Sequence, residues 1–385
     1  MNGRIYLDYA ATTPLRQEAR AAMEPYLTDT GFGNPSSLHA DGQRAKHALD
    51  DARDIIANAI GAAHSEITFT SGGSEADNAA LIGVMLACRD RGNHLITTSV
   101  EHEAIVKTCA FLARWGMRIT PLSVDKYGLV DPAQVEAAIE PGTVLVSVMH
   151  ANNEVGTIQP IREISEITRR RGVLFHTDAV QSFGQLPVYT DDLGVDLLSL
   201  SAHKIYGPKG MGALYVRTGI PIEPLIHGGG QERERRSGTE NVAGIIGFAE
   251  AARLLLEERE ATAIRLTELR DYLIEALIRE ISGVVLNGHP TERLPNNINI
   301  SFDDCDSESI LLSLDQAGIS AASGSACSSG SIEPSHVLLA MGLPDSRVNG
   351  AVRFTLGRNT TRAELRQTVD VLGEIIARIR RPQGK

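Results

Sequence analysis

The sequence predicts an α/β fold: a large domain with a mainly parallel, seven-stranded sheet covered by helices, followed by a smaller α/β domain. Between about residues 66 and 216, seven short β-rich runs alternate with amphipathic stretches, which is typical of a parallel sheet. A long helical pattern from Val242 to about Ile281 separates this region from a second mixed region. The seven runs are EITFT, HLITTSV, RITPLSV, TVLVSVMHANN, VLFHTDA, LLSLSA and ALYV.

The boundary between the two domains is expected within that long helix. We expect residues 1–15 to pack with the small domain, residues 16–256 to form the large domain and residues 257–385 to form the small one. The small domain contains a strand pattern, NNINISF, and helical patterns at about 308–316 and 361–380. A Ser-, Ala- and Gly-rich stretch at about 321–334 predicts a mobile loop.

Composition narrows the class of protein. With 385 residues, 42% of them hydrophobic, the chain can bury a large core. The net charge of -11 repels phosphate groups, so no direct contact with nucleic acid is expected. No apolar run could span a bilayer and the start, MNGRIYLDYAATTP, does not resemble a secretion signal, so we expect a cytoplasmic protein. Four cysteines show no disulfide framework and no paired metal-ligand spacing, so no bound metal is expected.

Two side chains are placed for cofactor chemistry. Lys204 follows a buried-strand pattern in SLSAHKIYGPKG, and Asp178 ends the preceding one in VLFHTDAVQ. Neighbouring parallel strands end at the same edge of a sheet, so both side chains should face one site. A lysine amine forms a Schiff base with an aldehyde cofactor, and a carboxylate keeps a pyridine nitrogen protonated. The pair predicts pyridoxal 5'-phosphate, although singly Lys204 could be a surface residue and Asp178 a helix N-cap.

A phosphate site is expected where EITFT runs into SGGSEADN. This is a strand, a Gly-Gly turn and a helix start, whose first amides can bind an anion. Gly73 and Ser74 are the expected contacts. Such a turn is common in parallel sheets, so it indicates a phosphate site mainly in combination with Lys204 and Asp178.

The chain resembles the cysteine desulfurases of the NifS/IscS type, which are pyridoxal-phosphate enzymes of the aminotransferase-like fold (fold type I). The resemblance implies that sulfur is removed from L-cysteine, giving L-alanine and an enzyme persulfide, and that residues 16–256 bind the cofactor. It runs nearly end to end, through LDYAATTP, GNPSSLH, TSGGSEADN, EHEAI, MHANNEVGT, HTDAVQ, SAHKIYGPKG, HGGGQERERRSGTEN, ASGSACSSGSIEPSHVL and RFTLGR.

The resemblance also implies cofactor contacts. His102 would stack on the pyridine ring and carry protons, which suits the near-neutral pKa of imidazole. Asn153 and Gln181 would contact the phenolic oxygen of the ring. Without the resemblance, His102 could be a capping or surface histidine, and the two amides could be turn residues. Further contacts implied near the phosphate are Ser201, Ala202 and His203.

Substrate binding and subunit assembly are implied in the same way. Arg353 would clamp the substrate carboxylate, helped by Asn34 and Asn153, because a guanidinium fork fits a carboxylate. Thr239 would contact the phosphate in a second subunit, so the active site would require a homodimer. From its glycine content alone, the region 228–238 could equally be a mobile surface loop.

Cys327 is expected to accept the sulfur. It lies in ASGSACSSGS, where no apolar residue would bury the thiol. Cys88 and Cys109 fall in helical patterns and are expected in the core. Cys305 lies between aspartates, which are expected to raise its pKa.

The persulfide implies a protein partner. A sulfur acceptor or an iron–sulfur scaffold would receive the sulfur, and Cys327 would contact a cluster on that partner transiently. The residues alone leave three alternative functions open: a selenocysteine lyase, an aminotransferase or other lyase of the same fold, and a cofactor-bearing scaffold. An aminotransferase has no use for a mobile cysteine loop. The physiological acceptor, whether for general iron–sulfur assembly, nitrogenase or tRNA thiolation, is also open.

Overall fold

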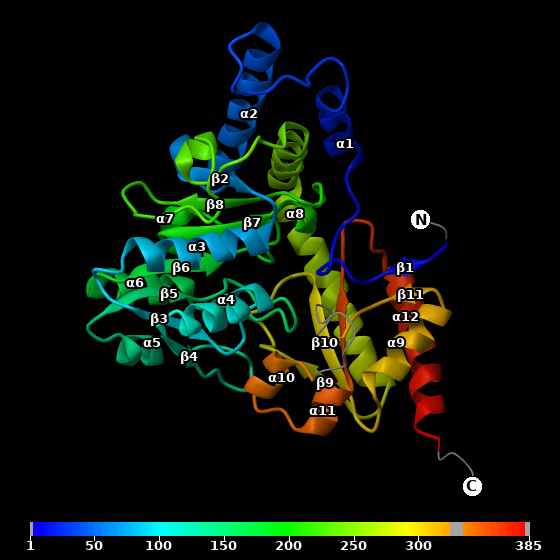
Figure 1. The fold of residues 1–385 in the computed structure, drawn as a ribbon. Coiled ribbons are helices and arrows are strands. Elements are labelled where there is room, and N and C mark those ends of the chain that lie inside the picture. Colours follow the sequence, from blue (N-terminus) through cyan, green and yellow to red (C-terminus); the bar gives the residue numbers. More distant parts are fainter. Residues whose placement is uncertain (1–2, 324–333, 382–385) are drawn as a thin grey trace.

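The computed structural model describes residues 3–323 and 334–381. It contains the expected seven-stranded sheet, in the order β2-β8-β7-β6-β5-β3-β4 (Figure 1). β8 is antiparallel to its neighbours β2 and β7, and the other neighbouring pairs are parallel. The predicted fold class is therefore confirmed. The strands are β2 (Ile67–Thr70), β3 (His94–Thr98), β4 (Arg118–Leu122), β5 (Thr143–Ser147), β6 (Leu174–Asp178), β7 (Leu197–Ser201) and β8 (Gly212–Val216).

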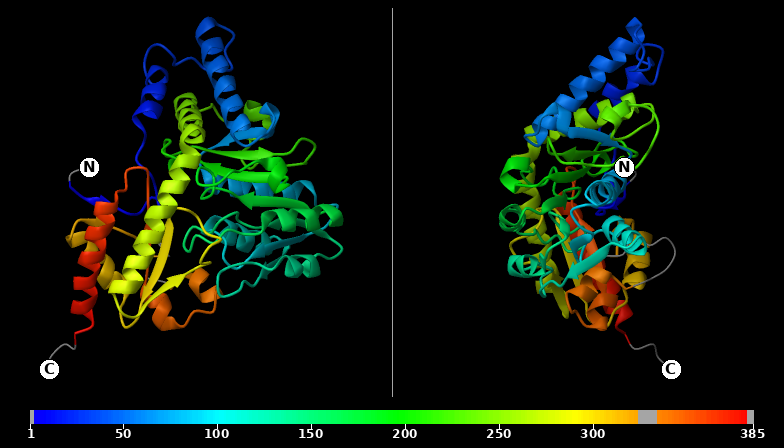
Figure 2. Two further views of the ribbon diagram at one scale, coloured as in Figure 1. Left: turned by 180° about the vertical axis from the view of Figure 1, so that it is seen from behind. Right: turned by 60° about the vertical axis from the view of Figure 1, so that its left-hand side comes forward.

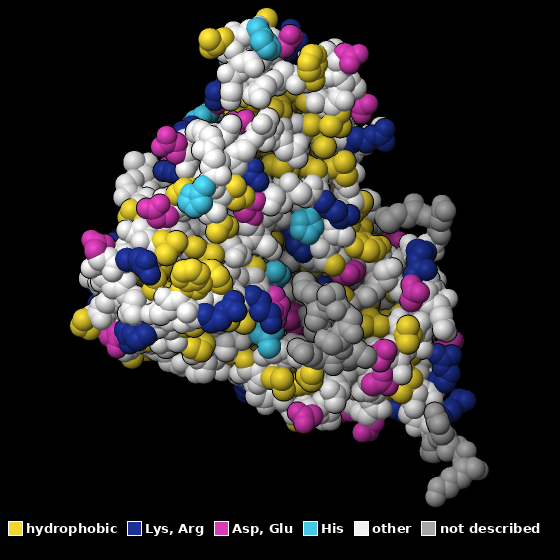
Figure 3. Space-filling view, in the orientation of Figure 1, with side chains coloured by type: hydrophobic (Ala, Val, Ile, Leu, Met, Phe, Trp, Pro, Cys, Tyr) yellow, Lys and Arg dark blue, Asp and Glu magenta, His cyan; other side chains and the backbone are white. Residues whose placement is uncertain are grey.

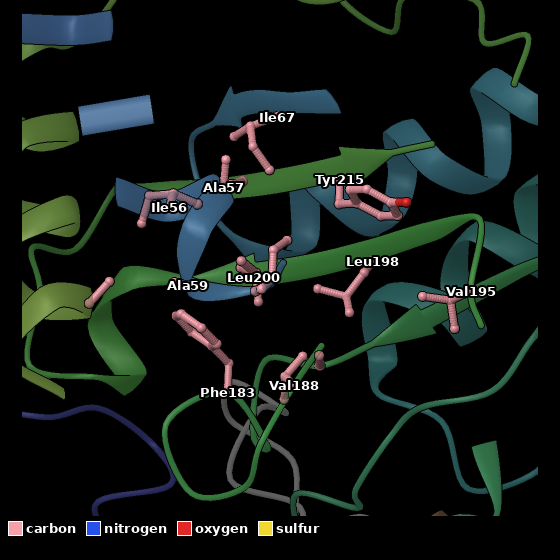
Figure 4. Packing of buried hydrophobic residues seen from close by; sticks show 14 of the residues in the cluster. Ile56, Ala57, Ala59, Ile67, Phe183, Val188, Val195, Leu198, Leu200 and Tyr215 are labelled. Carbon is pink, nitrogen blue, oxygen red and sulfur yellow. The ribbon is translucent and has the colours of Figure 1, made fainter. Parts of the chain in front are cut away.

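Helices pack on both faces of this sheet (Figure 2). On β3, Leu95 joins one core with α3 and α4, while Ile96 joins another with α2 and α6, because successive strand side chains point to opposite faces. Figure 4 shows the second core where residues of α2 lie against β2, β7 and β8. The helices are α2 (Ala40–Ala59), α3 (Gly73–Ala87), α4 (Glu103–Arg114), α5 (Pro132–Ala138), α6 (Ile161–Arg171) and α7 (Thr190–Leu193).

One helix of 39 residues, α8 (Val242–Glu280), joins the two parts of the molecule. Its residues up to Leu255 pack beneath the large sheet, and those from Leu266 to Leu277 pack in a separate core under the antiparallel sheet β12-β10-β9. The domain boundary predicted at residue 256 lies between these two groups. The remaining elements are β9 (Val284–Asn287), β10 (Asn297–Phe302), α9 (Ser307–Gln316), β11 (Ile319–Ser320), α10 (His336–Ala340), α11 (Asp345–Asn349), β12 (Ala351–Thr355) and α12 (Arg362–Ile379).

The N-terminal segment touches both parts. β1 (Ile5–Tyr6) pairs in parallel with β11, and Leu7 lies in the smaller core. The chain then passes the carboxyl edge of the large sheet and continues into α1 (Gln17–Met23), which packs against α8. In the part of the chain that the structure describes there are also four short 3-10 turns: η1 (Glu24–Tyr26), η2 (His64–Glu66), η3 (Ala202–Lys204) and η4 (Gln231–Glu234).

The surface carries charges of both signs. Acidic and basic side chains are spread over the face in Figure 3 rather than gathered by sign. No helix in the described part of the chain has the length and apolar character that crossing a membrane requires. Polar groups instead converge in a cavity where the large sheet, the N-terminal segment and β12 meet.

Candidate active site

A cavity of about 350 Å³ opens at the carboxyl ends of β6 and β7, beside the first turn of α3. It is also lined by residues that the sequence did not single out: Ala10, Ala11, Asp77, Met149 and Val180. The structure therefore brings most of the predicted site together. The predicted residues that line the cavity are Gly73, Ser74, His102, Asn153, Asp178, Gln181, Ser201, His203, Lys204 and Arg353.

Lys204 reaches the cavity from η3, directly after β7. Its Nζ atom donates hydrogen bonds to the carbonyl oxygens of Ala10 and Ala11, the second at 2.8 Å. The η3 turn is also attached to the N-terminal segment, because the Thr13 N–H donates to the His203 carbonyl at 2.9 Å. Two segments far apart in the sequence thus hold the amine at the cavity wall.

Asp178 is the last residue of β6 and its side chain is buried. Its Oδ1 atom accepts a hydrogen bond from the Val180 N–H at 2.8 Å. Burial raises the pKa of Asp178, whereas His102, the Val180 N–H and Lys204 act in the opposite direction. Asp178 therefore caps the following turn and lines the cavity at once.

His102 has a similar double role at the start of α4. Its Nδ1 atom accepts from the Ala104 N–H at 3.1 Å, which places the proton of a neutral ring on Nε2. The preceding residue, Glu101, is fully buried and accepts from Thr98 Oγ1 at 2.6 Å and from the Met149 N–H at 3.1 Å. Burial raises the pKa of Glu101 to about 8. His102 therefore caps α4, which is one of the roles considered from the sequence, and this cap orients its imidazole ring.

The phosphate end of the predicted site has a close backbone approach. A Cβ atom at Gly73 would lie 2.7 Å from Val180 Cγ2, so only glycine fits there. Ser201 Oγ is buried and has no hydrogen-bond partner among the described residues. His203 Nδ1 lies 3.2 Å from Thr12 Oγ1; burial, and then Lys204 and Lys209, lower the pKa of His203 to about 4. Its imidazole is therefore neutral near pH 7.

The opposite wall is formed by Arg353 of β12. Its guanidinium donates to the Asn153 carbonyl at 3.0 Å and pairs with Asp8 at 3.0 Å. Asn153 Oδ1 is buried without a partner in the described chain. Gln181 Nε2 donates to the Ala10 carbonyl at 3.0 Å. This wall thus joins both parts of the molecule to the N-terminal segment.

Three predicted residues do not line this cavity. Ala202 is buried behind it. Asn34 is exposed, and its Oδ1 atom accepts from the Ser36 N–H at 2.9 Å. Thr239 lines a second cavity of about 200 Å³, together with Thr70 and Arg236. Within one chain, Asn34 and Thr239 are therefore not brought to Lys204.

Cys327 lies outside the described residues, while the other three cysteines are free and buried. Cys88 and Cys109 are packed in the core, as predicted. The pKa of Cys305 is raised, and the neighbouring aspartates act in the predicted direction. Burial is the largest cause, Arg380 opposes it, and the neighbouring aspartates contribute less.

The chain on either side of residues 324–333 is attached to the site. Ala322 and Arg353 exchange two backbone hydrogen bonds, of 3.1 and 2.7 Å. Beyond these residues, Ser335 Oγ donates to the buried Glu154 carboxylate at 2.5 Å, and His336 Nε2 lies 3.0 Å from the Glu101 carbonyl oxygen. Glu154 follows Asn153 and Glu101 precedes His102. Both flanks are therefore linked to neighbours of cavity residues.

Asp77 and Asp8 were missed by the sequence reasoning. Asp77 is four residues after Gly73 in α3, and this helical spacing could have placed it on the same face. One ligand atom each from Asp77, His102 and Asp178 lies within 4.8 Å of the others, so the three side chains face one small space. Nothing comparable marks Asp8, whose contact with Arg353 depends on the folded N-terminal segment.

Comparison with known proteins agrees with this geometry. The family model described as "Aminotransferase class-V" matches residues 5–368. A protein of Dictyoglomus turgidum named "Cysteine desulfurase IscS" is 54% identical over 99% of this chain and 96% of its own length. One of the same name from Methanosarcina thermophila is 50% identical, covering 98% and 93%.

Solved structures agree as well. A chain titled "NIFS-LIKE PROTEIN" has a TM-score of 0.92 at 36% identity, covering 97% of this chain and 99% of its own. Another, titled "SspA in complex with cysteine", has a TM-score of 0.81 at 39% identity, covering 91% and 98%. The chain thus belongs to the class-V aminotransferase family. Within that family it is a cysteine desulfurase of the NifS/IscS type.

Proposed function

We propose that the enzyme uses pyridoxal 5'-phosphate to convert L-cysteine into L-alanine, and that the sulfur is left as a persulfide on Cys327. The observation that carries this proposal is the convergence of Lys204, Asp178 and Arg353 on one cavity. They offer an amine for an aldehyde, a carboxylate for a ring nitrogen and a guanidinium for a substrate carboxylate. The structural neighbour described in complex with cysteine supports the choice of substrate.

The residues present fit this cofactor. Ser201 Oγ and the first amides of α3 are donors suited to a phosphate, and Ser201 Oγ is otherwise without a partner in the described chain. Asn153 Oδ1 is likewise buried and open to a ligand. The cavity volume, about 350 Å³, lies in the range of roughly 300–1,000 Å³ that small-molecule sites occupy. When bound, pyridoxal phosphate supplies an aldehyde and a ring that accepts electrons.

The side chains around the cavity divide the remaining work. Arg353 holds the substrate carboxylate in place of Asp8, and Lys204 and His102 move protons between substrate atoms. The Cys327 thiolate forms an S–S bond to the substrate sulfur as the C–S bond of the substrate breaks. Cysteine plus the enzyme thiol thus gives alanine plus the enzyme persulfide, with no external oxidant or reductant.

We propose a homodimer in which Thr239 of one chain contacts the cofactor phosphate in the other. Thr239 and Asn34 both lie away from the cavity of their own chain. Near Asn34, Phe32 and Leu38 are 70% and 93% exposed, and exposed apolar side chains of this size favour a protein interface. A second subunit covering this region would bury them and complete the site.

Sulfur delivery requires a further protein. As the resemblance to the NifS/IscS type implies, the persulfide would pass to a sulfur acceptor such as an iron–sulfur scaffold, and Cys327 would contact its cluster only transiently. A cytoplasmic location fits the free thiols of Cys88, Cys109 and Cys305, because reducing compartments keep thiols free.

The test combines product analysis with labelling. The protein, saturated with pyridoxal phosphate, is given L-cysteine, L-selenocysteine or an amino acid with a keto-acid acceptor, and alanine, sulfide and selenide are measured. Borohydride reduction and peptide mapping then locate the bound cofactor. We expect alanine from cysteine and a label on Lys204. A label on another lysine, or faster transfer of the amino group to a keto acid, would contradict the proposal.

A further inference from the structure

Asp77 forms part of the floor of the cavity. It lies in α3, one turn beyond Gly73, and is only 1% exposed. A ligand atom of its carboxyl lies within 4.8 Å of one in Asp178 and of one in His102. Its Oδ1 atom has no hydrogen-bond partner among the described residues. Two buried carboxyl groups therefore share one small space.

The surroundings of the two carboxyls differ. Asp178 accepts the Val180 N–H and is favoured as an anion by His102 and Lys204. Asp77 instead faces Ser199, with Asp178 and Glu101 adding repulsion.

The His176 imidazole lies close to Asp77, with Nε2 3.7 Å from its carboxyl. Burial lowers the pKa of His176 to about 3, so this ring is neutral. Its nitrogens lie 2.9 Å from Ser147 Oγ and 3.0 Å from Ser199 Oγ. His176 therefore offers Asp77 no positive charge.

We propose that Asp77 is a positioning residue that remains a neutral carboxylic acid, so that the cavity floor carries a single negative charge on Asp178. Two carboxylates this close cannot both ionise at low cost in a buried site, and the proton goes to the one with less support. Consistent with this, burial and then Asp178 raise the pKa of Asp77 well above its ordinary value.

The role of Asp77 rests on the proposed function, in which the Asp178 carboxylate would hold the protonated ring nitrogen of pyridoxal phosphate. An ionised Asp77 would place a second anion there and would pull the ring proton away from Asp178. A neutral Asp77 leaves Asp178 as the one counter-charge and can donate its own proton to a neighbouring oxygen. The orientation and charge of Asp178 are thus set by a residue that need not touch the substrate.

The protonation of Asp77 can be tested without the cofactor. In wild type, the unfolded chain loses this proton near pH 4 but the folded chain keeps it, so stability falls as pH rises above that point. The folding equilibrium constant then falls by up to about tenfold per pH unit. Asp77→Asn keeps the shape of the neutral acid and should remove this part of the decline between pH 5 and 8. The exposed control Asp192→Asn should follow wild type.

A second measurement uses the cofactor-loaded enzyme. Asp77→Asn should retain the visible spectrum of the bound cofactor and its pH midpoint, whereas Asp178→Asn should shift both. Parallel pH–stability curves for Asp77→Asn and wild type, or a spectrum shifted as far as in Asp178→Asn, would overturn the proposal. If Asp77→Asn does not fold, infrared spectroscopy of wild type with isotope-labelled aspartate at pH 7 replaces the variant. A carbonyl band of protonated aspartate is expected, and its absence would overturn the proposal. The pH–stability measurement needs no cofactor. A negative result there would overturn the role of Asp77 without contradicting the proposed function.

Discussion

The cavities at Lys204 and at Thr239 differ in how complete they are within one chain. The first contains buried polar atoms that have no partner in the described chain, including Ser201 Oγ and Asn153 Oδ1. The second is closed by ion pairs: Arg236 binds the Glu75 carboxylate at 2.9 Å, and Glu232 binds Arg53 through two contacts of 2.6 Å. The second cavity also has one such atom, Glu240 Oε2, but its ion pairs attach a loop of the same chain.

The held loop is conformationally strained. Glu232, Arg233 and Glu234 have φ values of 47°, 57° and 66°, and this left-handed conformation costs a residue with a side chain roughly 1–2 kcal/mol. The buried Arg53–Glu232 pair and the Phe69 N–H, which donates to Glu232 at 2.8 Å, offset that cost. Thr239 thus lies away from Lys204 of its own chain, as the proposed contact across a dimer interface requires.

The largest expected effect is in the first cavity, at Asp178. Asp178→Ala should lower kcat/KM by about 10²–10³-fold, because it removes the carboxylate that would keep the ring nitrogen of the bound cofactor protonated. The free energy of unfolding should change far less, since removal of a buried carboxylate also removes its desolvation cost. Steady-state kinetics and urea unfolding measure the two. Similar small effects in Asp178→Ala and in the exposed control Asp192→Ala would break the contrast between the cavities.

Arg353 should show a different kinetic signature. Arg353→Lys keeps the charge but loses the fork geometry, so KM for cysteine should rise by about 10–100-fold, the value of one charged hydrogen bond. The spectrum of the bound cofactor should remain, because Arg353 holds substrate. A fall in kcat with unchanged KM would show that Arg353 does not bind the substrate carboxylate.

The role of Thr239 can be sharpened with mixed dimers. Thr239→Ala should weaken cofactor retention by about tenfold, typical of one lost hydrogen bond. In a dimer of one Thr239→Ala chain and one Lys204→Ala chain, a contact across the interface leaves one site with both residues. That dimer should release one cofactor equivalent as slowly as wild type. Fast release of all cofactor would place Thr239 in the site of its own chain.

The smallest effect is expected at Ser335, which follows the segment that contains Cys327. Ser335→Ala removes the hydrogen bond to Glu154 and should slow persulfide formation by about 3–10-fold, typical of a buried bond of about 1 kcal/mol. The cofactor spectrum should be unchanged. Ser346→Ala, at an exposed serine, is the matched control. Equal rates for both variants in a single-turnover assay would mean that this attachment does not position the segment.

Local sequence patterns were sufficient to predict much of the fold and of the candidate site. Asp178 and Lys204 could be placed together because each ends a buried strand, and strand ends meet by geometry alone. The helical spacing from Gly73 could have indicated Asp77, but that spacing alone does not show that this helix face meets Asp178 and His102. The aspartates beside Cys305 were recognised as raising its pKa, but the larger cause, burial, is a property of the folded chain. The expected roles of Asn34 and Thr239 came from the resemblance alone, because a local pattern in one chain does not define a contact in the proposed dimer.

The most direct measurement is the fate of sulfur in Cys327→Ser. Labelled cysteine is mixed with cofactor-loaded wild type and variant, the reaction is quenched rapidly, and alanine and protein-bound sulfur are followed together. The account predicts that wild type forms one alanine for each persulfide on the Cys327 peptide in the first turnover. The variant should bind cysteine and change the cofactor spectrum, yet form neither product. Alanine and sulfide at the wild-type rate from Cys327→Ser would contradict the proposed mechanism and favour a direct elimination or a selenocysteine-directed lyase.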